Sequence, residues 1–352
     1  MSSSSSSSSF LVLNGVVVSS PPETPPISIF LQNHSGAYTT TRTDSNASLI
    51  LFWDRHLLRL AQSTSIIAQS KPGFFHPQTA AATTISSWDA LIRPLVTQSL
   101  QSGLPIVCKE RSEEKGRSEE EIVITTLVSG DSRASNGLDV YVHFGAYVPI
   151  GFAGGESGAR LAAVGPGREI ANAKFSEWVR VRKGLEKLRP PSVTELLLSN
   201  DGDRILEGSV TNFFVVCSRD VNEALGDLNE PRSGFPFEVQ TAPVTVGVLP
   251  GVIRQLIVEV CSSLGIPLRE VAPSWANREL WKEAFVTNSL RLVQHVEMVQ
   301  APSSWESLQS KTWKEVSWVE KQFEGPGPIT TEIQKELTQR ACAEGFPLNS
   351  FL

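Results

Sequence analysis

The side chains that most often carry chemistry in enzymes are spread along this chain and do not form a familiar motif. The histidines lie far apart, and no cysteine lies near another cysteine or a histidine at the spacing of a metal site. A metal site would have to be assembled entirely by the fold, so we expect no metal. The residues in question are His34, His56, His76, His143 and His295, with Cys108, Cys217, Cys261 and Cys342.

A glycine-dense segment, residues 151–158, is the other candidate, because glycine-rich loops can hold phosphate groups. Its glycines do not follow the GxGxxG pattern and do not open a helix after a strand, so a dinucleotide site is not indicated. The segment has no periodicity and lies near the middle of the chain, which favours an interdomain loop. We therefore expect a domain at 10–150, this loop at 151–158, and a larger domain at 159–352.

The elements predicted before the loop are a mixture of helices and strands. Apolar residues at helical spacing predict an amphipathic helix at 52–61, and a second helix is predicted at 87–99. Alternating apolar residues at 121–128 and 138–144 predict strands. This half of the chain therefore reads as an α+β domain.

Beyond the loop, a helix is predicted at 175–188, with strands at 194–199 and 212–217. The segment Leu249–Arg254 opens a further helix, which we expect to end at Gly265 because glycine is the preferred C-terminal cap. The strands and helices of this half must position any functional groups found here.

Three blocks in the second half resemble those of the class IV (fold type IV) pyridoxal-phosphate aminotransferases. This family includes branched-chain aminotransferase, D-amino acid aminotransferase and aminodeoxychorismate lyase. The blocks occur in the family's order and are Leu196–Val215, Leu249–Arg254 and Glu283–Leu290. The second is similar to L-x-G-I-T-R and the third to E-V-F-x-S/T-G-T. Gly36–Thr40 and His56–Leu60 in the first half agree more loosely.

The resemblance implies an α/β (α+β) protein of fold type IV, with a small N-terminal α+β domain and a larger C-terminal domain whose mixed β-sheet is barrel-like. It implies a transaminase that uses pyridoxal 5'-phosphate, in a homodimer, to move an amino group between an amino acid and a 2-oxo acid. Two alternatives stay open. One is a lyase of the aminodeoxychorismate type, and the other is a catalytically inactive protein of the same fold.

The resemblance also assigns the residues that carry the cofactor. In this family the lysine that forms the Schiff base precedes a glutamate by a little over thirty residues. Lys174 precedes Glu207 by 33 residues (207 − 174 = 33). Glu207 is then expected to bind the protonated ring nitrogen.

The cofactor phosphate is expected to bind at the start of the helix that follows Leu249, because helix N-termini attract anions. The expected donors are the amides of Val252 and Ile253, the Arg59 side chain and the Ser289 hydroxyl. The family's threonine is replaced by Ile253, so only the Ile253 backbone can serve.

Substrate residues are assigned by the same resemblance. Tyr147 is similar to a tyrosine that helps hold the substrate carboxylate, alongside the amides of Ser289 and Leu290. The tyrosine found five residues after the lysine in branched-chain enzymes is Val179 here, so Tyr38, or alternatively Arg180, is the candidate contact for the cofactor phenolate. The family's glycine in the third block is Asn288, which tolerates left-handed geometry.

Composition limits the partners and the compartment. The chain has 31 Lys+Arg and 37 Asp+Glu, a net charge of -6, so nucleic acid is not an expected partner. No apolar run reaches roughly 18 residues, so no membrane association is expected. The serine run at 2–9 lacks the basic and apolar regions of a secretory signal. We expect a cytoplasmic protein, with the chloroplast as the alternative because of the serine-rich start.

Overall fold

The computed structural model describes residues 9–76, 79, 82–113, 119–130, 137–152, 158–218 and 236–352. The chain divides into two compact units, each made of separated segments. Unit 1 comprises Met1–Pro149, Ala173–Arg180 and Arg340–Leu352, and unit 2 comprises Ile150–Asn172 and Val181–Gln339. Residues 153–157 of the predicted interdomain loop lie outside the described residues, so the domain boundaries stay a prediction.

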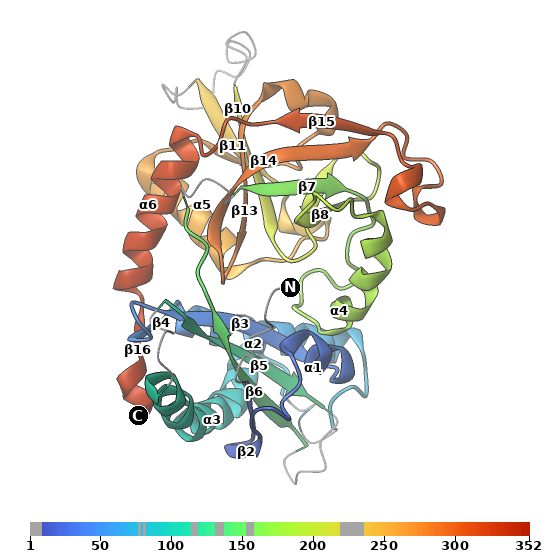
Figure 1. Cartoon of the computed structure of the whole chain (residues 1–352). Helices are drawn as coiled ribbons and strands as arrows, with labels where there is room; N and C mark the ends of the chain where they lie inside the picture. Colours follow the sequence, from blue (N-terminus) through green and yellow to red (C-terminus); the bar gives the residue numbers. More distant parts are fainter. Residues whose placement is uncertain are drawn as a thin grey trace. The chain divides into compact units, whose positions relative to one another are not determined.

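Unit 1 is built on a seven-stranded sheet with the order β16-β4-β3-β5-β6-β1-β2 (Figure 1). All its strand pairs are antiparallel, and the predicted strands at 121–128 and 138–144 are confirmed as β5 and β6. The strands are β1 (Phe10–Leu13), β2 (Val16–Ser19), β3 (Ala37–Asp44), β4 (Leu49–Ile50), β5 (Glu121–Ser129), β6 (Asp139–Tyr147) and β16 (Phe346–Pro347).

The sheet is accompanied by helices α1 (Ile27–Asn33), α2 (Trp53–Ser70) and α3 (Ile85–Glu113). The last two confirm the helices predicted at 52–61 and 87–99, and both are longer than predicted. Helix α2 packs on β3 and α3 packs on β6 and β1. Leu57, Leu60 and Ile67 of α2 are buried, as one apolar face of an amphipathic helix requires.

Unit 2 holds a nine-stranded sheet in which β12-β11-β10-β13-β14-β7-β8-β9 are neighbours in that order and β15 pairs with β14. The sheet is mixed, because β14 with β7, β7 with β8 and β11 with β12 are parallel pairs. Its strands are β7 (Ala159–Ala163), β8 (Glu195–Ser199), β9 (Ile205–Gly208), β10 (Asn212–Ser218), β11 (Phe237–Thr241), β12 (Leu268–Glu270), β13 (Trp281–Asn288), β14 (Leu292–Pro302) and β15 (Trp318–Gln322).

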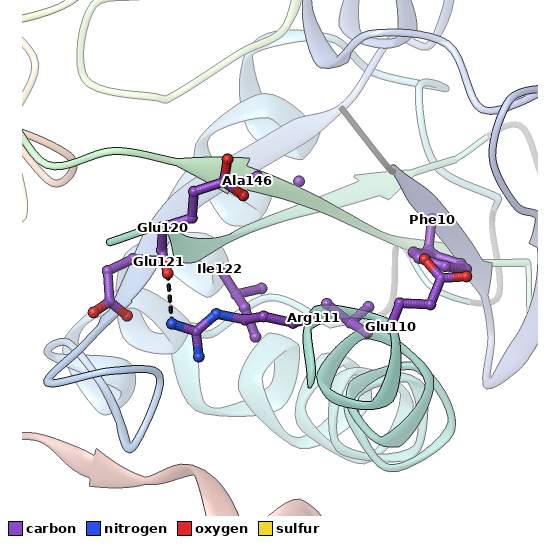
Figure 2. Close-up of a pocket in the computed structure, with 9 residues that line it drawn as sticks. Phe10, Glu110, Arg111, Glu120, Glu121, Ile122 and Ala146 are labelled. Carbon is purple, nitrogen blue, oxygen red and sulfur yellow. Dashed lines mark hydrogen bonds between the residues drawn. The ribbon is translucent and has the colours of Figure 1, made fainter. Parts of the chain in front are cut away.

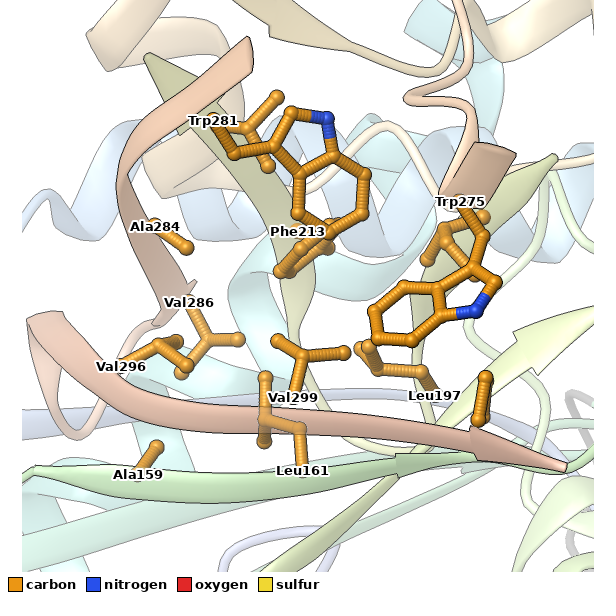
Figure 3. Close-up of a cluster of buried hydrophobic side chains, with 14 of the residues drawn as sticks. Ala159, Leu161, Leu197, Phe213, Trp275, Trp281, Ala284, Val286, Val296 and Val299 are labelled. Carbon is orange, nitrogen blue, oxygen red and sulfur yellow. The ribbon is translucent and has the colours of Figure 1, made fainter. Parts of the chain in front are cut away.

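The unit 2 sheet curls on itself. Strands β9 and β10 are not neighbours in the sheet order, yet only residues 209–211 join them, so the sheet must bend to bring them together. The bend encloses a core of aromatic and branched side chains, among them Phe213, Trp281 and Val286 (Figure 3). This curled mixed sheet confirms the predicted fold class.

The remaining helices lie between or after these strands. Helix α5 ends at Gly265, which has φ 66°, so the predicted glycine cap is confirmed. The predicted helix at 175–188 divides into α4 and the 3-10 helix η1. The elements are α4 (Glu177–Val181), η1 (Arg182–Leu188), η3 (Val244–Val246), α5 (Val252–Leu264), η4 (Trp275–Leu280), η5 (Leu308–Ser310), η6 (Trp313–Glu315), α6 (Pro328–Ala343) and η7 (Leu348–Phe351).

The last fifty residues contribute to both units. Strand β15 pairs with β14 in unit 2, and β16 pairs with β4 in unit 1. In the part of the chain that the structure describes, no helix is both long enough and apolar enough to cross a membrane.

Candidate functional site

Lys174 lies in the short segment of unit 1 that follows Asn172, and its backbone is fixed on both sides. Its carbonyl accepts a hydrogen bond from the amide of Tyr38 at 2.9 Å, and its own amide donates to Ser63 Oγ at 3.1 Å. Strand β3 and helix α2 therefore hold this residue. The Nζ atom lies 4.7 Å from the centroid of the Tyr38 ring, within the range of a cation–π contact.

One face of helix α2 presents polar side chains to this lysine. His56, Arg59 and Ser63 recur at helical spacing, which places them on the same face. The charges of Lys174 and Arg59 both act on the His56 imidazole, so the three groups lie near one another. Arg55, which shares a side of this helix with Arg59, instead pairs with Glu344 at 2.7 Å.

The His56 imidazole is neutral. Burial first, and then the nearby positive charges of Lys174 and Arg59, lower its pKa to about 3. Its Nδ1 atom shares a 2.7 Å hydrogen bond with Thr39 Oγ1. Its Nε2 atom is buried and has no hydrogen-bond partner among the described residues. A buried polar atom without a partner is costly, and a bound ligand would satisfy it.

The position five residues after the lysine is apolar. Val179 is buried in a cluster that includes Tyr38, Phe30 and Leu127. Tyr38, whose ring centroid lies 4.7 Å from Lys174 Nζ, belongs to the same cluster as Val179. Arg180, the alternative candidate, has a 56% exposed side chain whose ion-pair partner is Glu177 of its own helix.

Tyr147 lies away from this group within unit 1. In the sheet register Tyr38 pairs with Leu127 of β5, whereas Tyr147 pairs with Glu121 of the same strand. These partners are six positions apart (127 − 121 = 6), which is about 20 Å along a strand. The structure does not bring Tyr147 beside Lys174 of the same unit.

Glu207 is buried in unit 2, with a side chain that is only 1% exposed. Its Oε1 atom lies 2.9 Å from Nε of Arg168, and its Oε2 atom accepts hydrogen bonds from the Leu249 amide at 3.1 Å and from Asn212 Nδ2 at 3.4 Å. Arg168 was not predicted as a partner of Glu207. This network holds the carboxylate in one orientation and ties it to the segment that precedes helix α5.

Helix α5 begins directly after this network, at Val252. Its N-cap is Gly251, and no side chain caps the helix among the described residues. A Cβ atom at Gly251 would clash with Asn212 Oδ1, so any larger residue here would have to displace the Asn212 side chain. Val252 and Ile253 occupy the first turn, where the backbone amides have no partner within the helix and can donate to an anion.

The end of strand β13 lies next to the same residues. Thr287 pairs with Asn212 in the sheet register, and the Thr287 hydroxyl is buried without a hydrogen-bond partner in the described part of the chain. Ser289 and Leu290 form the turn that follows. Asn288 does not adopt the left-handed conformation suggested by the sequence, and Leu292, with φ 59°, adopts it instead.

The structure therefore groups the predicted residues within each unit. Unit 1 brings Tyr38, Arg59 and Lys174 together, and unit 2 brings Glu207 close to the start of α5 and to the β13 turn. Sequence reasoning gave no role to His56 or Thr287, and it did not connect Arg168 with Glu207. Within unit 2, the oriented Glu207 carboxylate and the uncapped start of α5 are chemically suited to a protonated ring nitrogen and to a phosphate. Within unit 1, the buried Nε2 atom of His56 lacks a partner among the described residues and could accept a hydrogen bond from a ligand or donate one to it.

A separate small pocket in unit 1 is not part of this set. It is a cavity of about 20 Å³, close to the space of one water molecule, beside Phe10, Arg111 and Ile122 (Figure 2). Arg111 Nη2 donates a 2.7 Å hydrogen bond to the Glu120 carbonyl there. None of the predicted site residues lines this cavity.

Comparisons with known proteins agree on one family. The family model "Amino-transferase class IV" matches residues 36–299, a range that contains every predicted site residue. No match is found among curated protein sequences.

Solved structures with a similar fold include a branched-chain aminotransferase from Thermoproteus uzoniensis crystallised with norvaline (18% identity, 97% of this chain and 99% of that chain, TM-score 0.58). They also include the Escherichia coli branched-chain aminotransferase (17%, 97% and 99%, 0.56). A third is a putative 4-amino-4-deoxychorismate lyase from Legionella pneumophila (17%, 90% and 96%, 0.52). At these identities the likeness concerns the fold alone.

Proposed function

The chain belongs to the amino-transferase class IV family and is a pyridoxal-phosphate-dependent transaminase, and on this premise we propose that Lys174 is the lysine that carries the cofactor. The observation that supports this most directly is the environment of Lys174. It combines a fixed backbone, a phenol ring under Nζ, and the neutral His56 imidazole near Arg59.

In this proposal the unit 1 residues bind the cofactor and move a proton. When bound, pyridoxal phosphate withdraws electrons from the carbon next to the substrate amine. Lys174 Nζ would take the proton from that carbon and return it. Tyr38 would steady Nζ through its ring and would offer its hydroxyl to the cofactor phenolate. Arg59 would bind the phosphate, and His56 would offer Nε2 without adding a charge.

The unit 2 residues would orient the ring and the phosphate. Glu207 would accept the ring N–H, and its ion pair with Arg168 and the hydrogen bonds that it accepts from Leu249 and Asn212 would keep the carboxylate from rotating. The amides of Val252 and Ile253 and the Ser289 hydroxyl would bind phosphate oxygens at the start of α5.

We further propose an amino acid and a 2-oxo acid as the substrate pair, with the substrate bound near Ser289 and Leu290 and the protein acting as a homodimer. A carboxylate role for Tyr147 would require Tyr147 of a second copy, since Tyr147 lies about six strand positions from the Tyr38 register within its own unit.

The proposal is tested by the absorbance of the protein incubated with pyridoxal phosphate. We expect wild type to show a near-visible band that Lys174→Ala lacks, and an amino acid donor should convert that band to the pyridoxamine form. Lys183→Ala is the matched control, because Lys183 lies in η1 a short distance along the chain. A band that survives in Lys174→Ala would overturn the assignment.

Product analysis separates the alternatives. A 2-oxo acid formed from the donor supports transamination. Release of pyruvate from aminodeoxychorismate, without transfer of an amino group to a 2-oxo acid, would favour the lyase. A lysine-dependent band that no amine converts would favour the catalytically inactive protein. We consider this alternative because Val179, Ile253 and Asn288 depart from the family pattern.

A further inference from the structure

The turn after strand β13 is closed by hydrogen bonds between the Asn288 side chain and two backbone amides of the same turn. Asn288 Oδ1 accepts a hydrogen bond from the amide of Leu290 at 3.0 Å and another from the amide of Arg291 at 2.9 Å. The Asn288 Nδ2 atom donates to the Val210 carbonyl at 3.5 Å. An asparagine that bonds the backbone two and three residues ahead closes a compact turn. The glycine that the family pattern places here has no side chain with which to do this.

A buried ion pair fixes the other side of the turn. Arg291 Nη1 lies 2.8 Å from Glu195 Oε2, and the Glu195 side chain is 2% exposed. Glu195 Oε1 also accepts hydrogen bonds from the Val210 amide at 2.9 Å and from Thr211 Oγ1 at 2.8 Å. Moving the turn would separate a buried charge from its partner, which is strongly unfavourable. The turn therefore stays in place, and a ligand that needs its amides must displace the Asn288 oxygen.

We propose that Asn288 is a specificity-determining residue, which competes with the α-carboxylate of a substrate for the amides of Leu290 and Arg291. This rests on the proposed function, in which the same turn binds the substrate. A carboxylate gains little by replacing an acceptor that already satisfies both donors. Asn288 thus shifts the donor preference of the chain away from α-amino acids and towards primary amines with no carboxylate beside the amine.

The direct test compares two donors in wild type, Asn288→Gly and Asn288→Asp. n-Pentylamine has the same amine and alkyl chain as norleucine and lacks only the α-carboxylate. We expect Asn288→Gly to raise the ratio of kcat/KM for norleucine to that for pentylamine by about tenfold, the value of roughly one hydrogen bond. Asn288→Asp keeps an acceptor of the same shape and adds a negative charge, so its ratio should equal or fall below that of wild type. An equal ratio in wild type and Asn288→Gly would overturn the proposal.

A second readout does not depend on turnover. Hydrogen–deuterium exchange at the Leu290 and Arg291 amides should be slow in wild type and at least about tenfold faster in Asn288→Gly, since the acceptor is lost. Hexanoate, a carboxylate with no amine, should bind more tightly to Asn288→Gly than to wild type in calorimetry. Thermal melting of each variant confirms that it is folded.

These readouts separate the two proposals. If no donor reacts in any variant while exchange and hexanoate binding still change as expected, the proposed function fails and the competition for the amides stands. If donors react but neither the ratio, the exchange nor the hexanoate affinity changes, the role of Asn288 is wrong and the transaminase assignment stands.

Discussion

His56 is expected to make the folded protein sensitive to acid. Its pKa is about 3 in the folded state against an ordinary value of 6.5, so between these pH values the unfolded state binds the extra proton. Above pH 6.5 the neutral His56 imposes no penalty on folding. As the pH falls from 6.5 towards 3, His56 lowers the free energy of unfolding by at most about 1.4 kcal/mol per pH unit. Urea unfolding of the cofactor-free protein at pH 7, 6 and 5 should show a steeper loss for wild type than for His56→Gln.

The comparison with His56→Gln isolates this residue. Burial also lowers the pKa of His143 and His295, but both remain in the variant and cancel in the difference. Parallel stability curves for the two proteins would show that His56 is not held neutral beside Lys174 and Arg59.

Single functional residues could be predicted only where a block of sequence identified them. Glu207 lies in the first matching block, and Lys174 was assigned from its interval of 33 residues to Glu207; both roles stay predictions. Arg168 lies 39 positions before Glu207 (207 − 168 = 39), and no local pattern connects two side chains that only the folded sheet brings together. The signal for His56 was present, since it shares a helix face with Arg59, but a lone histidine gave no reason to assign it a role.

At the scale of elements, Glu283 of β13 is expected to hold the start of helix α6. Its carboxylate accepts hydrogen bonds from the amide of Ile329 at 3.1 Å, and from the amide of Thr330 at 2.8 Å and its hydroxyl at 2.7 Å. It acts as the cap that satisfies the first amides of the helix. Glu283→Ala should lower the free energy of unfolding by roughly 1–2 kcal/mol, measured by urea denaturation.

Glu324→Ala is the matched control for this helix start, because Glu324 is exposed and close in sequence. The same substitution there should change stability by less than about 0.5 kcal/mol. Equal effects of the two variants would show that the Glu283 cap contributes nothing.

Local signals predicted some elements well and others poorly. The end of α5 followed from Gly265, because glycine adopts the left-handed conformation without strain. Helix α3 continues well beyond the predicted end at residue 99 and contains Pro105, a residue type that usually interrupts a helix. Strand β14 was not predicted, since both its faces are largely buried in the curled sheet and its apolar residues lack a period of two.

At the scale of the whole molecule, each compact unit supplies part of the predicted cofactor-binding set. Lys174 and Arg59 belong to unit 1, although Lys174 follows a segment of unit 2, whereas Glu207 and the start of α5 belong to unit 2. The sequence predicted a two-part chain, but only long-range contacts could reveal that the lysine segment and the C-terminus return to unit 1.

The most direct test of the central claim is to map the residue that carries the cofactor. The protein is loaded with pyridoxal phosphate, reduced with borohydride to make the attachment permanent, and digested for peptide mass spectrometry. We expect a phosphopyridoxyl group on Lys174 in wild type and none on the corresponding peptide of Lys174→Ala. A modification found on Lys183 or Lys187 instead, or no modified peptide in wild type, would contradict it.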